Sequence, residues 1–182
     1  SRYIEAATNT AACCCNVQMF DREHSRLSLI QAALKEAGVE RLGAEEEKLS
    51  HAEYLGYEKA LGMELLPAQA IFSELRASKS EEEIGYLREA QAISEKALAE
   101  VLRIIKPGMT ELELQAELIY CMYKNGGTGL AFDPIVVSGP NTSMPHGVPS
   151  DRELQFGDFI TMDFGCLYKG YCSDMTRTVA LG

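Results

Sequence analysis

Two aspartates, Asp163 and Asp174, lie near the carboxyl end of the chain in two stretches of β-strand composition, Phe159–Gly165 and Tyr171–Val179. A short turn around Tyr168–Gly170 separates the stretches, and this pattern predicts a β-hairpin. Because side chains alternate between the two faces of a strand, the length of the turn decides whether the two carboxylates share a face.

Two registers of this hairpin place both carboxylates on one face. A loop at Tyr168–Lys169 makes Asp163 and Asp174 direct cross-strand partners, with Cβ atoms about 5 Å apart. A loop at Lys169–Gly170 pairs Asp163 with Thr176 instead, and Asp174 becomes a diagonal neighbour at roughly 7–8 Å. A three-residue loop would put the carboxylates on opposite faces.

Like charges in such positions destabilise a sheet unless something offsets their repulsion. Either both acids point into water, or a cation lies between them. Hard divalent cations take oxygen ligands, and two metal ions held by shared ligands form the centre of many hydrolytic enzymes. The spacing alone leaves both interpretations open.

One histidine, His146, precedes the hairpin in a loop of turn-forming residues, Gly139–Gly147. Loops held by rigid elements carry function more often than other segments, so His146 is a candidate catalytic residue. The alternative is an ordinary hydrogen-bonded loop histidine. His24 and His51 lie in helical segments of surface character, and we expect them to be structural or exposed.

The composition bounds the class of protein. A chain of 182 residues with 46% hydrophobic residues can form one substantial domain, or one small and one medium domain. A net charge of −10 argues against nucleic acid or an anionic membrane as partner, and no apolar run reaches the ~18 residues that span a bilayer. The chain begins at Ser1 without a methionine, so the absence of a signal peptide is weak evidence.

The six cysteines are not spaced like a disulfide framework or a zinc site. Three are consecutive and none forms a Cys-x-x-Cys pair; they are Cys13, Cys14, Cys15, Cys121, Cys166 and Cys172. We expect buried or half-buried reduced thiols, as in a cytosolic protein.

Short strands and helices alternate over residues 1–78, which predicts an α/β unit whose first elements would precede Ser1. The expected elements are a strand end at Arg2–Ala6, helices at Arg22–Ala37, Ser50–Gly62 and Ala70–Arg76, and strands at Val39–Gly43 and Met63–Pro67.

A polar stretch, Ser78–Glu83, is the expected domain boundary. Ser80 and Glu83 form a capping box for the longest helix, which reaches about Ile105. A second such pair, Thr110 and Glu113, opens the next helix, and strand patterns begin after Gly127.

Three motifs together resemble the pita-bread metallopeptidases, the group of Xaa-Pro aminopeptidases, prolidases and methionine aminopeptidases with creatinase as a relative. The motifs are Phe132–Gly139, Met144–Pro149, and Met162–Gly165 with Ser173–Thr178. The gaps of 17 positions from His146 to Asp163 and 11 from Asp163 to Asp174 also match. The resemblance is strong over residues 79–182 and looser over 1–78.

The resemblance implies an α+β fold. Residues 79–182 would be the N-terminal half of a pita-bread catalytic domain, and residues 1–78 part of a small creatinase-type α/β N-terminal domain. Asp163 would ligate one divalent metal ion and Asp174 would bridge two, with manganese or cobalt expected and zinc as an alternative. His146 would hydrogen-bond the substrate and stabilise the tetrahedral intermediate, and Phe132 would line an apolar substrate pocket.

The implied function is that of an Xaa-Pro aminopeptidase acting on peptides with proline at the second position. The alternatives are an Xaa-Pro dipeptidase (prolidase) and a metal-free, creatinase-like relative. We expect a cytoplasmic enzyme, homodimeric when full length, with neither nucleic acid nor membrane as partner. The family's remaining ligands lie beyond the position of Gly182, so the chain as given is expected to be inactive. Strand parity also places Thr161 and Thr176 on the carboxylate face, as candidate hydrogen-bond donors.

Overall fold

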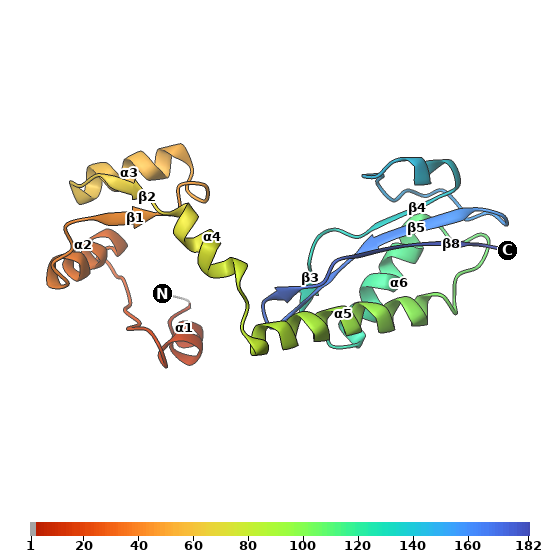
Figure 1. Ribbon diagram of the computed structural model, residues 1–182, viewed down its shortest axis with the longest axis horizontal. Helices are drawn as coiled ribbons and strands as arrows, with labels where there is room; N and C mark the ends of the chain where they lie inside the picture. The colour runs from red at the N-terminus through yellow and green to blue at the C-terminus, as the bar shows by residue number, and fades with distance from the viewer. Residues whose placement is uncertain (1–2) are drawn as a thin grey trace. The chain divides into compact units, whose positions relative to one another are not determined.

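The computed structural model describes residues 3–182. The chain divides into two compact units, Ser1–Ser78 and Lys79–Gly182 (Figure 1). The division falls in the polar stretch where the sequence predicts a boundary. Each unit has its own β-structure: one two-stranded sheet in the first and two three-stranded sheets in the second.

The first unit places two short parallel strands beside helices. Its elements are α1 (Ile4–Ala11), α2 (Arg26–Glu36), β1 (Leu42–Ala44), α3 (His51–Leu61), β2 (Leu65–Pro67) and α4 (Gln69–Ala77). β1 and β2 pair in parallel, with α3 as the connection between them. The predicted capping box of Ser50 and Glu53 is present at the start of α3, so this α/β pattern is confirmed.

The start of the described chain is a helix, which corrects the expectation of a strand end there. Ile4–Ala11 is α-helical, while Arg2 lies outside the described residues. The segment contains Ala6, Ala7 and Ala11, and alanine has the highest helix propensity of all residues. This preference outweighs the β-forming character of the neighbouring tyrosine and isoleucine.

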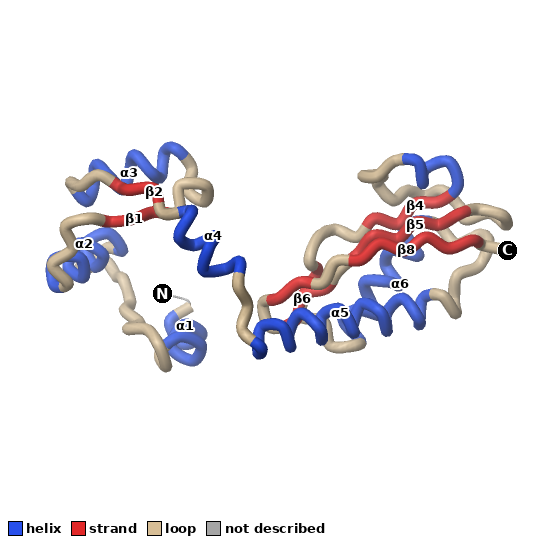
Figure 2. The backbone as a smooth tube through the Cα atoms, in the orientation of Figure 1, coloured by secondary structure: helices blue, strands red, loops and turns tan. Residues whose placement is uncertain are grey.

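The second unit combines two helices with two antiparallel sheets (Figure 2). The helices are α5 (Glu81–Val101) and α6 (Glu111–Lys124), followed by the short 3-10 helix η1 (Gly139–Ser143) between strands. One sheet has the order β3-β6-β7 and the other β4-β5-β8. The strands are β3 (Gly129–Leu130), β4 (Ile135–Ser138), β5 (Phe159–Phe164), β6 (Cys166–Tyr168), β7 (Tyr171–Cys172) and β8 (Met175–Ala180).

The core of this unit lies between the two helices and one face of the sheets. Ile160, Met162 and Phe164 of β5 are fully buried and belong to one cluster with residues of α5 and α6. Burying each such side chain contributes about 1.5–3 kcal/mol. Since alternate residues of a strand face opposite ways, burial of these three turns Thr161 and Asp163 to the open face.

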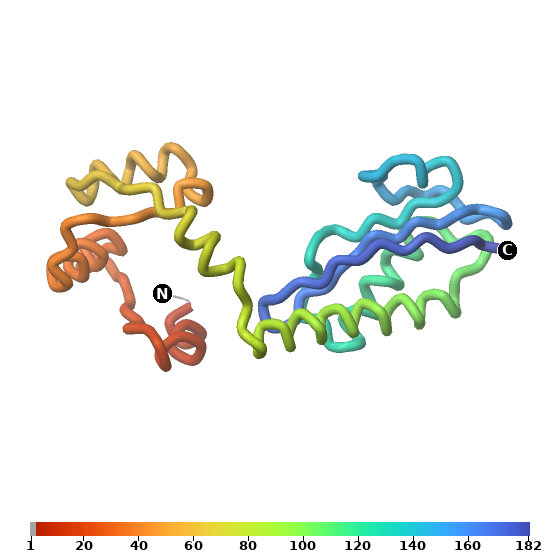
Figure 3. The backbone as a smooth tube through the Cα atoms, viewed as in Figure 1, coloured from red at the N-terminus to blue at the C-terminus, as the bar shows by residue number. Residues whose placement is uncertain are grey.

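The hairpin adopts the register with its loop at Lys169–Gly170. Tyr168 pairs with Tyr171, and Asp163 pairs with Thr176. Lys169 and Gly170 have φ angles of 47° and 85°, the left-handed conformation that two-residue hairpin loops of type I′ require. Figure 3 shows the two arms of the hairpin running side by side at the blue end of the chain.

Candidate active site

The two predicted metal ligands occupy one side of this hairpin. Asp163 is half-buried near the end of β5, and Asp174 is exposed in the break between β7 and β8. Because Asp163 lies opposite Thr176, Asp174 takes the diagonal position on the same face, where Cβ atoms lie roughly 7–8 Å apart. The structure therefore selects the second of the two registers that keep the carboxylates together.

The two threonines of this face have different partners. Thr176 donates a hydrogen bond from Oγ1 to Oδ1 of Asp163 at 2.7 Å, which confirms its expected role as a donor to a carboxylate. Thr161 is instead hydrogen-bonded to Thr178, its cross-strand partner, at 2.9 Å. Thr176 thus orients the Asp163 carboxylate through its Oδ1 atom.

The backbone beside Asp174 is held by contacts that the sequence pattern does not reveal. Ser173 is buried, and its Oγ accepts a hydrogen bond from the Cys166 amide at 3.0 Å. The same hydroxyl lies 2.8 Å from Oγ of Ser94 in α5. A Cβ at Gly165 would lie 1.9 Å from the carbonyl oxygen of Ser173. Only glycine permits this close approach, which fixes the chain immediately before Asp174.

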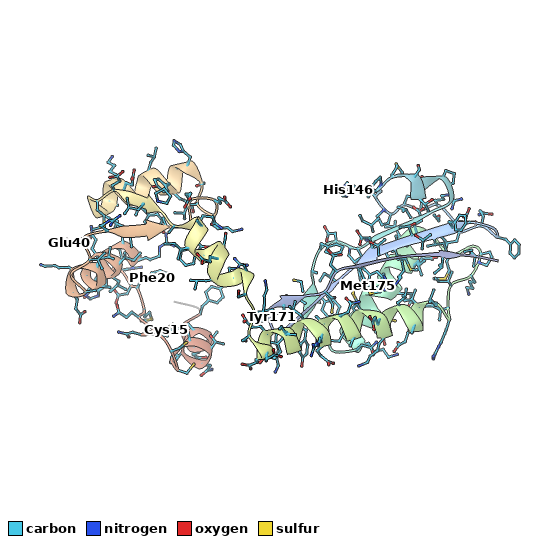
Figure 4. The ribbon with its side chains drawn as sticks, in the orientation of Figure 1. Cys15, Phe20, Glu40, His146, Tyr171 and Met175 are labelled. Carbon is cyan, nitrogen blue, oxygen red and sulfur yellow. The ribbon has the colours of Figure 1, made fainter. Side chains whose placement is uncertain are left out.

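The hairpin is also attached to the start of α5. Tyr171 donates a hydrogen bond to Oε1 of Glu83 at 2.6 Å, and Figure 4 shows Tyr171 beside the first turns of that helix. Lys169 at the tip lies over the ring of Tyr86, with its Nζ 4.8 Å from the ring centroid. The pKa of Glu83 is lowered, and the hydrogen bond from Tyr171 has the largest effect on it.

His146 is exposed on the loop that follows η1, on the side of the β4-β5-β8 sheet where β4 forms the edge (Figure 4). It lines a groove of about 510 Å³ together with Val148, Pro149 and Ile135. The next residue, Gly147, is buried against β4, since a Cβ there would lie 2.8 Å from Cγ1 of Val137. The loop therefore presents an imidazole at the wall of a mainly apolar groove.

Phe132, the predicted wall of a substrate pocket, is half-buried in the segment between β3 and β4. Its neighbours Leu130 and Asp133 line the groove beside His146. The two other histidines, His24 and His51, are exposed, as expected.

One buried carboxylate, that of Glu111 at the start of α6, is missed by the sequence reasoning. Burial by itself raises the pKa of Glu111, but hydrogen bonds from Ser150, Ser138 and Asn141 outweigh this effect and the pKa is lowered. An acidic residue in the first turn of a capped helix is usually exposed and favours the helix dipole, so the pattern gave no sign of burial.

Arg152 and Asp158 form a half-buried ion pair beside this carboxylate. Nη1 of Arg152 lies 2.7 Å from Oδ2 of Asp158, and the same nitrogen donates to Oγ of Ser138. The hydrogen bond from Arg152 holds the pKa of the Asp158 carboxyl below its usual range. The pair connects the end of β4 to the chain that leads into β5.

The carboxylates of the hairpin fit part of a metal site. Oxygen ligands from aspartates suit divalent ions such as manganese, and Asp163 and Asp174 present theirs from one face. Across residues 3–182, no group of three or more histidine, cysteine, aspartate or glutamate side chains is arranged to hold a metal ion. A complete coordination shell would therefore need donors in addition to these two residues.

The thiols are more exposed than expected. Cys121 and Cys166 are buried, whereas Cys13, Cys14, Cys15 and Cys172 are exposed. Sγ of Cys166 faces the carbonyl oxygen of Ala90 in α5 at 3.2 Å, so that thiol is part of the core packing. Over residues 3–182, no helix has the length and apolarity needed to cross a membrane.

Comparison with known proteins supports the family suggested by the motifs. The chain is 42% identical over 159 residues to an uncharacterised peptidase of Bacillus subtilis, YqhT, covering 85% of this chain and 45% of that protein. The crystal structure of the X-Pro aminopeptidase of Thermotoga maritima matches with a TM-score of 0.90 and 33% identity, over 100% of this chain and 51% of that one.

The Xaa-Pro dipeptidase of Bacillus anthracis matches with a TM-score of 0.89 and 39% identity, over 100% of this chain and 50% of that one. The chain thus spans about half the length of the relatives it matches. These matches confirm an α+β pita-bread fold. Since the model of metallopeptidase family M24 matches residues 85–182, more than half of the chain, this chain belongs to metallopeptidase family M24.

Proposed function

We propose that the protein containing this chain is a metal-dependent peptidase that removes the N-terminal residue from peptides with proline at the second position. The observation that carries this proposal is the hairpin register, which pairs Asp163 with Thr176 and, by the alternation of side chains along a strand, implies the same face for Asp174. Membership of a metallopeptidase family supports it, as does the likeness to an X-Pro aminopeptidase structure.

In this proposal Asp163 would ligate one divalent ion and Asp174 would bridge two, with manganese or cobalt as the expected ions and zinc as the alternative. Such ions, when bound, supply a hydroxide at neutral pH and polarise the scissile carbonyl. The chain's own contribution is orientation. Thr176 holds one oxygen of Asp163, and the packing of Gly165 against Ser173 fixes the backbone beside Asp174.

His146 acts in this proposal as a hydrogen-bond donor to the substrate rather than as a metal ligand. Its position on the wall of the groove would aim the imidazole at a carbonyl oxygen that becomes negatively charged during the reaction. A donor aimed at developing charge contributes about 10²–10³ in kcat. Phe132 would add apolar surface for the substrate.

Two alternatives stay open for the whole protein. An Xaa-Pro dipeptidase is favoured by the equally good match to the Bacillus anthracis structure. A metal-free, creatinase-like relative is disfavoured because it would have no need for a like-charged pair on one sheet face. In either peptidase case we infer a cytoplasmic homodimer that acts on peptides, and the charge of −10 disfavours nucleic acid or an anionic membrane as partner.

The test compares Asp174→Asn with Asp151→Asn in the full-length protein. Asp151 is an exposed aspartate outside the strands of the hairpin, so its variant is a control for the loss of one charge. Metal content and hydrolysis of an Ala-Pro-Ala tripeptide and an Ala-Pro dipeptide are measured after loading with manganese. We expect Asp174→Asn to lose at least one metal ion per chain and nearly all activity, while the control keeps both.

Full metal occupancy with normal hydrolysis in Asp174→Asn would refute the metal assignment. The two peptides separate the aminopeptidase from the dipeptidase, since an aminopeptidase cleaves the tripeptide and a strict dipeptidase cleaves only the dipeptide.

A further inference from the structure

A single buried carboxylate joins both ends of the loop that carries His146. We call this segment, Gly139–Pro149, the histidine loop. Oε1 of Glu111 accepts hydrogen bonds from the amide and hydroxyl of Ser138 at 2.7 and 2.8 Å, immediately before the loop. Oε2 accepts from the amide and hydroxyl of Ser150 at 3.0 and 2.7 Å, immediately after it.

The hydrogen bonds that offset the cost of burying the Glu111 carboxylate come from this loop and from the two serines that flank it. The side chain is fully buried, and a buried carboxylate is costly unless hydrogen bonds replace its hydration. Besides the four bonds from the two serines, Oε1 accepts a fifth from Nδ2 of Asn141 at 3.2 Å, inside the loop. The nearby cation Arg152 pairs with Asp158 and reaches this network through the Ser138 hydroxyl.

The bonds inside the histidine loop are local. Thr142 donates to the carbonyl of Gly139, and the amide of Gly147 donates to the carbonyl of Met144. Such bonds shape the loop but do not set its position relative to the sheet. That position depends on the packing of Gly147 against Val137 and on the side-chain contacts of Glu111. Backbone bonds also anchor the two ends, since Ser138 pairs with Ile160 and the Leu112 amide donates to the Ser150 carbonyl at 3.2 Å.

We propose that Glu111 is a positioning residue that sets the location of His146 by holding both ends of the histidine loop. This inference rests on the catalytic role proposed for His146. The chemistry requires an ionised carboxylate, because all five partners are donors and a carboxylate is an acceptor at both oxygens. Glutamine has the same shape but would direct an NH2 group at donors, so Glu111→Gln should release one end of the loop.

The first test measures Glu111→Gln in the full-length, manganese-loaded protein. A displacement of about 1 Å at a catalytic group can lower the rate by about 10²-fold, so we expect kcat to fall roughly 10- to 100-fold, with KM within about twofold and metal content unchanged. Glu117→Gln is the matched control, since Glu117 is an exposed glutamate of the same helix outside its capped first turn.

Coupling to His146 separates positioning from general destabilisation. If Glu111 acts through His146, the double variant Glu111→Gln/His146→Ala should be no slower than His146→Ala alone. Effects that multiply in the double variant, or a normal kcat in Glu111→Gln, would overturn the proposal.

A second measurement needs no activity. Hydrogen exchange of the full-length protein should show at least about tenfold faster exchange over residues 138–150 in Glu111→Gln, with β5 unchanged and Glu117→Gln like the parent. Should Glu111→Gln fail to fold, Ser150→Ala removes one donor and keeps the carboxylate, and it should speed exchange over the same residues. Unchanged exchange there would overturn the proposal. Release of the loop with no peptidase activity in the parent protein would instead refute the proposed function and support the role of Glu111 in holding the histidine loop.

Discussion

Replacing Gly165 with alanine tests the claim that close backbone contact fixes the site. The new Cβ would lie 1.9 Å from the carbonyl oxygen of Ser173, whereas real Cβ contacts are at least 3.0 Å. The two segments would have to separate by at least 3.0 − 1.9 = 1.1 Å. Both segments are backbone held between paired strands, Gly165 between β5 and β6 and Ser173 between β7 and β8, so neither can turn aside as a flexible side chain would.

The size of the effect follows from the contacts that this separation breaks. Overpacking of a buried site costs about 1–3 kcal/mol. Moving Ser173 also strains its backbone bond to the Cys166 carbonyl, now 2.9 Å, and leaving one such buried group unpaired costs about 1–3 kcal/mol. We therefore expect Gly165→Ala to destabilise the second unit by about 2–6 kcal/mol, a large part of the total stability of a domain.

The assay is urea unfolding of the full-length protein, followed by tyrosine fluorescence and circular dichroism. The loss should lower the midpoint of the second unit by at least about 1 M. Gly85→Ala is the matched control, because Gly85 lies within α5 and a Cβ added there would meet nothing within 4 Å. Alanine should stabilise that helix by about 0.5–1 kcal/mol. A midpoint for Gly165→Ala equal to that of the parent would refute the steric argument.

Three further predictions concern the site. His146→Ala in the full-length protein should lower kcat about 10²–10³-fold while metal content stays full; loss of metal with the side chain would contradict the donor role. The 182-residue chain alone should bind manganese or cobalt weakly, leave Xaa-Pro peptides uncleaved, and self-associate or lose cooperative folding. Calorimetric titration, a hydrolysis assay and sedimentation would measure this, and tight binding of two ions with turnover would contradict it. The pKa values of Asp158 and Glu111 are lowered in the folded protein, so their ionised carboxylates stabilise the fold at pH values above the unfolded pKa of about 4. The free energy of unfolding should fall as the pH drops below that value. Acid unfolding of Asp158→Asn should depend less steeply on pH, and an unchanged slope would exclude this contribution.

Local signals made much of the fold predictable. Ser80 with Glu83 and Thr110 with Glu113 form the expected capping boxes, since such pairs depend only on residues three apart. The hairpin was also foreseen as an element, but its register was not. Strand parity fits both two-residue loops, and the choice is made in the loop itself, where Lys169 and Gly170 adopt positive φ angles.

Contacts between distant segments were not predictable from the pattern. In the sequence, Glu111 looks like an exposed acidic residue in the first turn of a helix. In the structure, the chain returns to this helix at Ser150, and Glu111 is buried. Likewise, Ser94 on α5 and Ser173 beside Asp174 are separated by 79 residues. Thr161 shows the limit of strand parity: its face was predicted correctly, but the identity of its partner depends on which residue lies opposite. The strand expected at Arg2–Ala6 was wrong because local alanine content favours a helix.

The hairpin has a consequence for the order in which the site is assembled during folding. The contact between Thr176 and Asp163 spans 13 residues, and hairpins with short turns form in about 1–10 μs. The contact between Glu111 and Ser150 spans 39 residues, and its formation must overcome a larger loss of chain entropy. We therefore expect the two acidic residues to be brought together first and the histidine loop to dock onto an already formed carboxylate face.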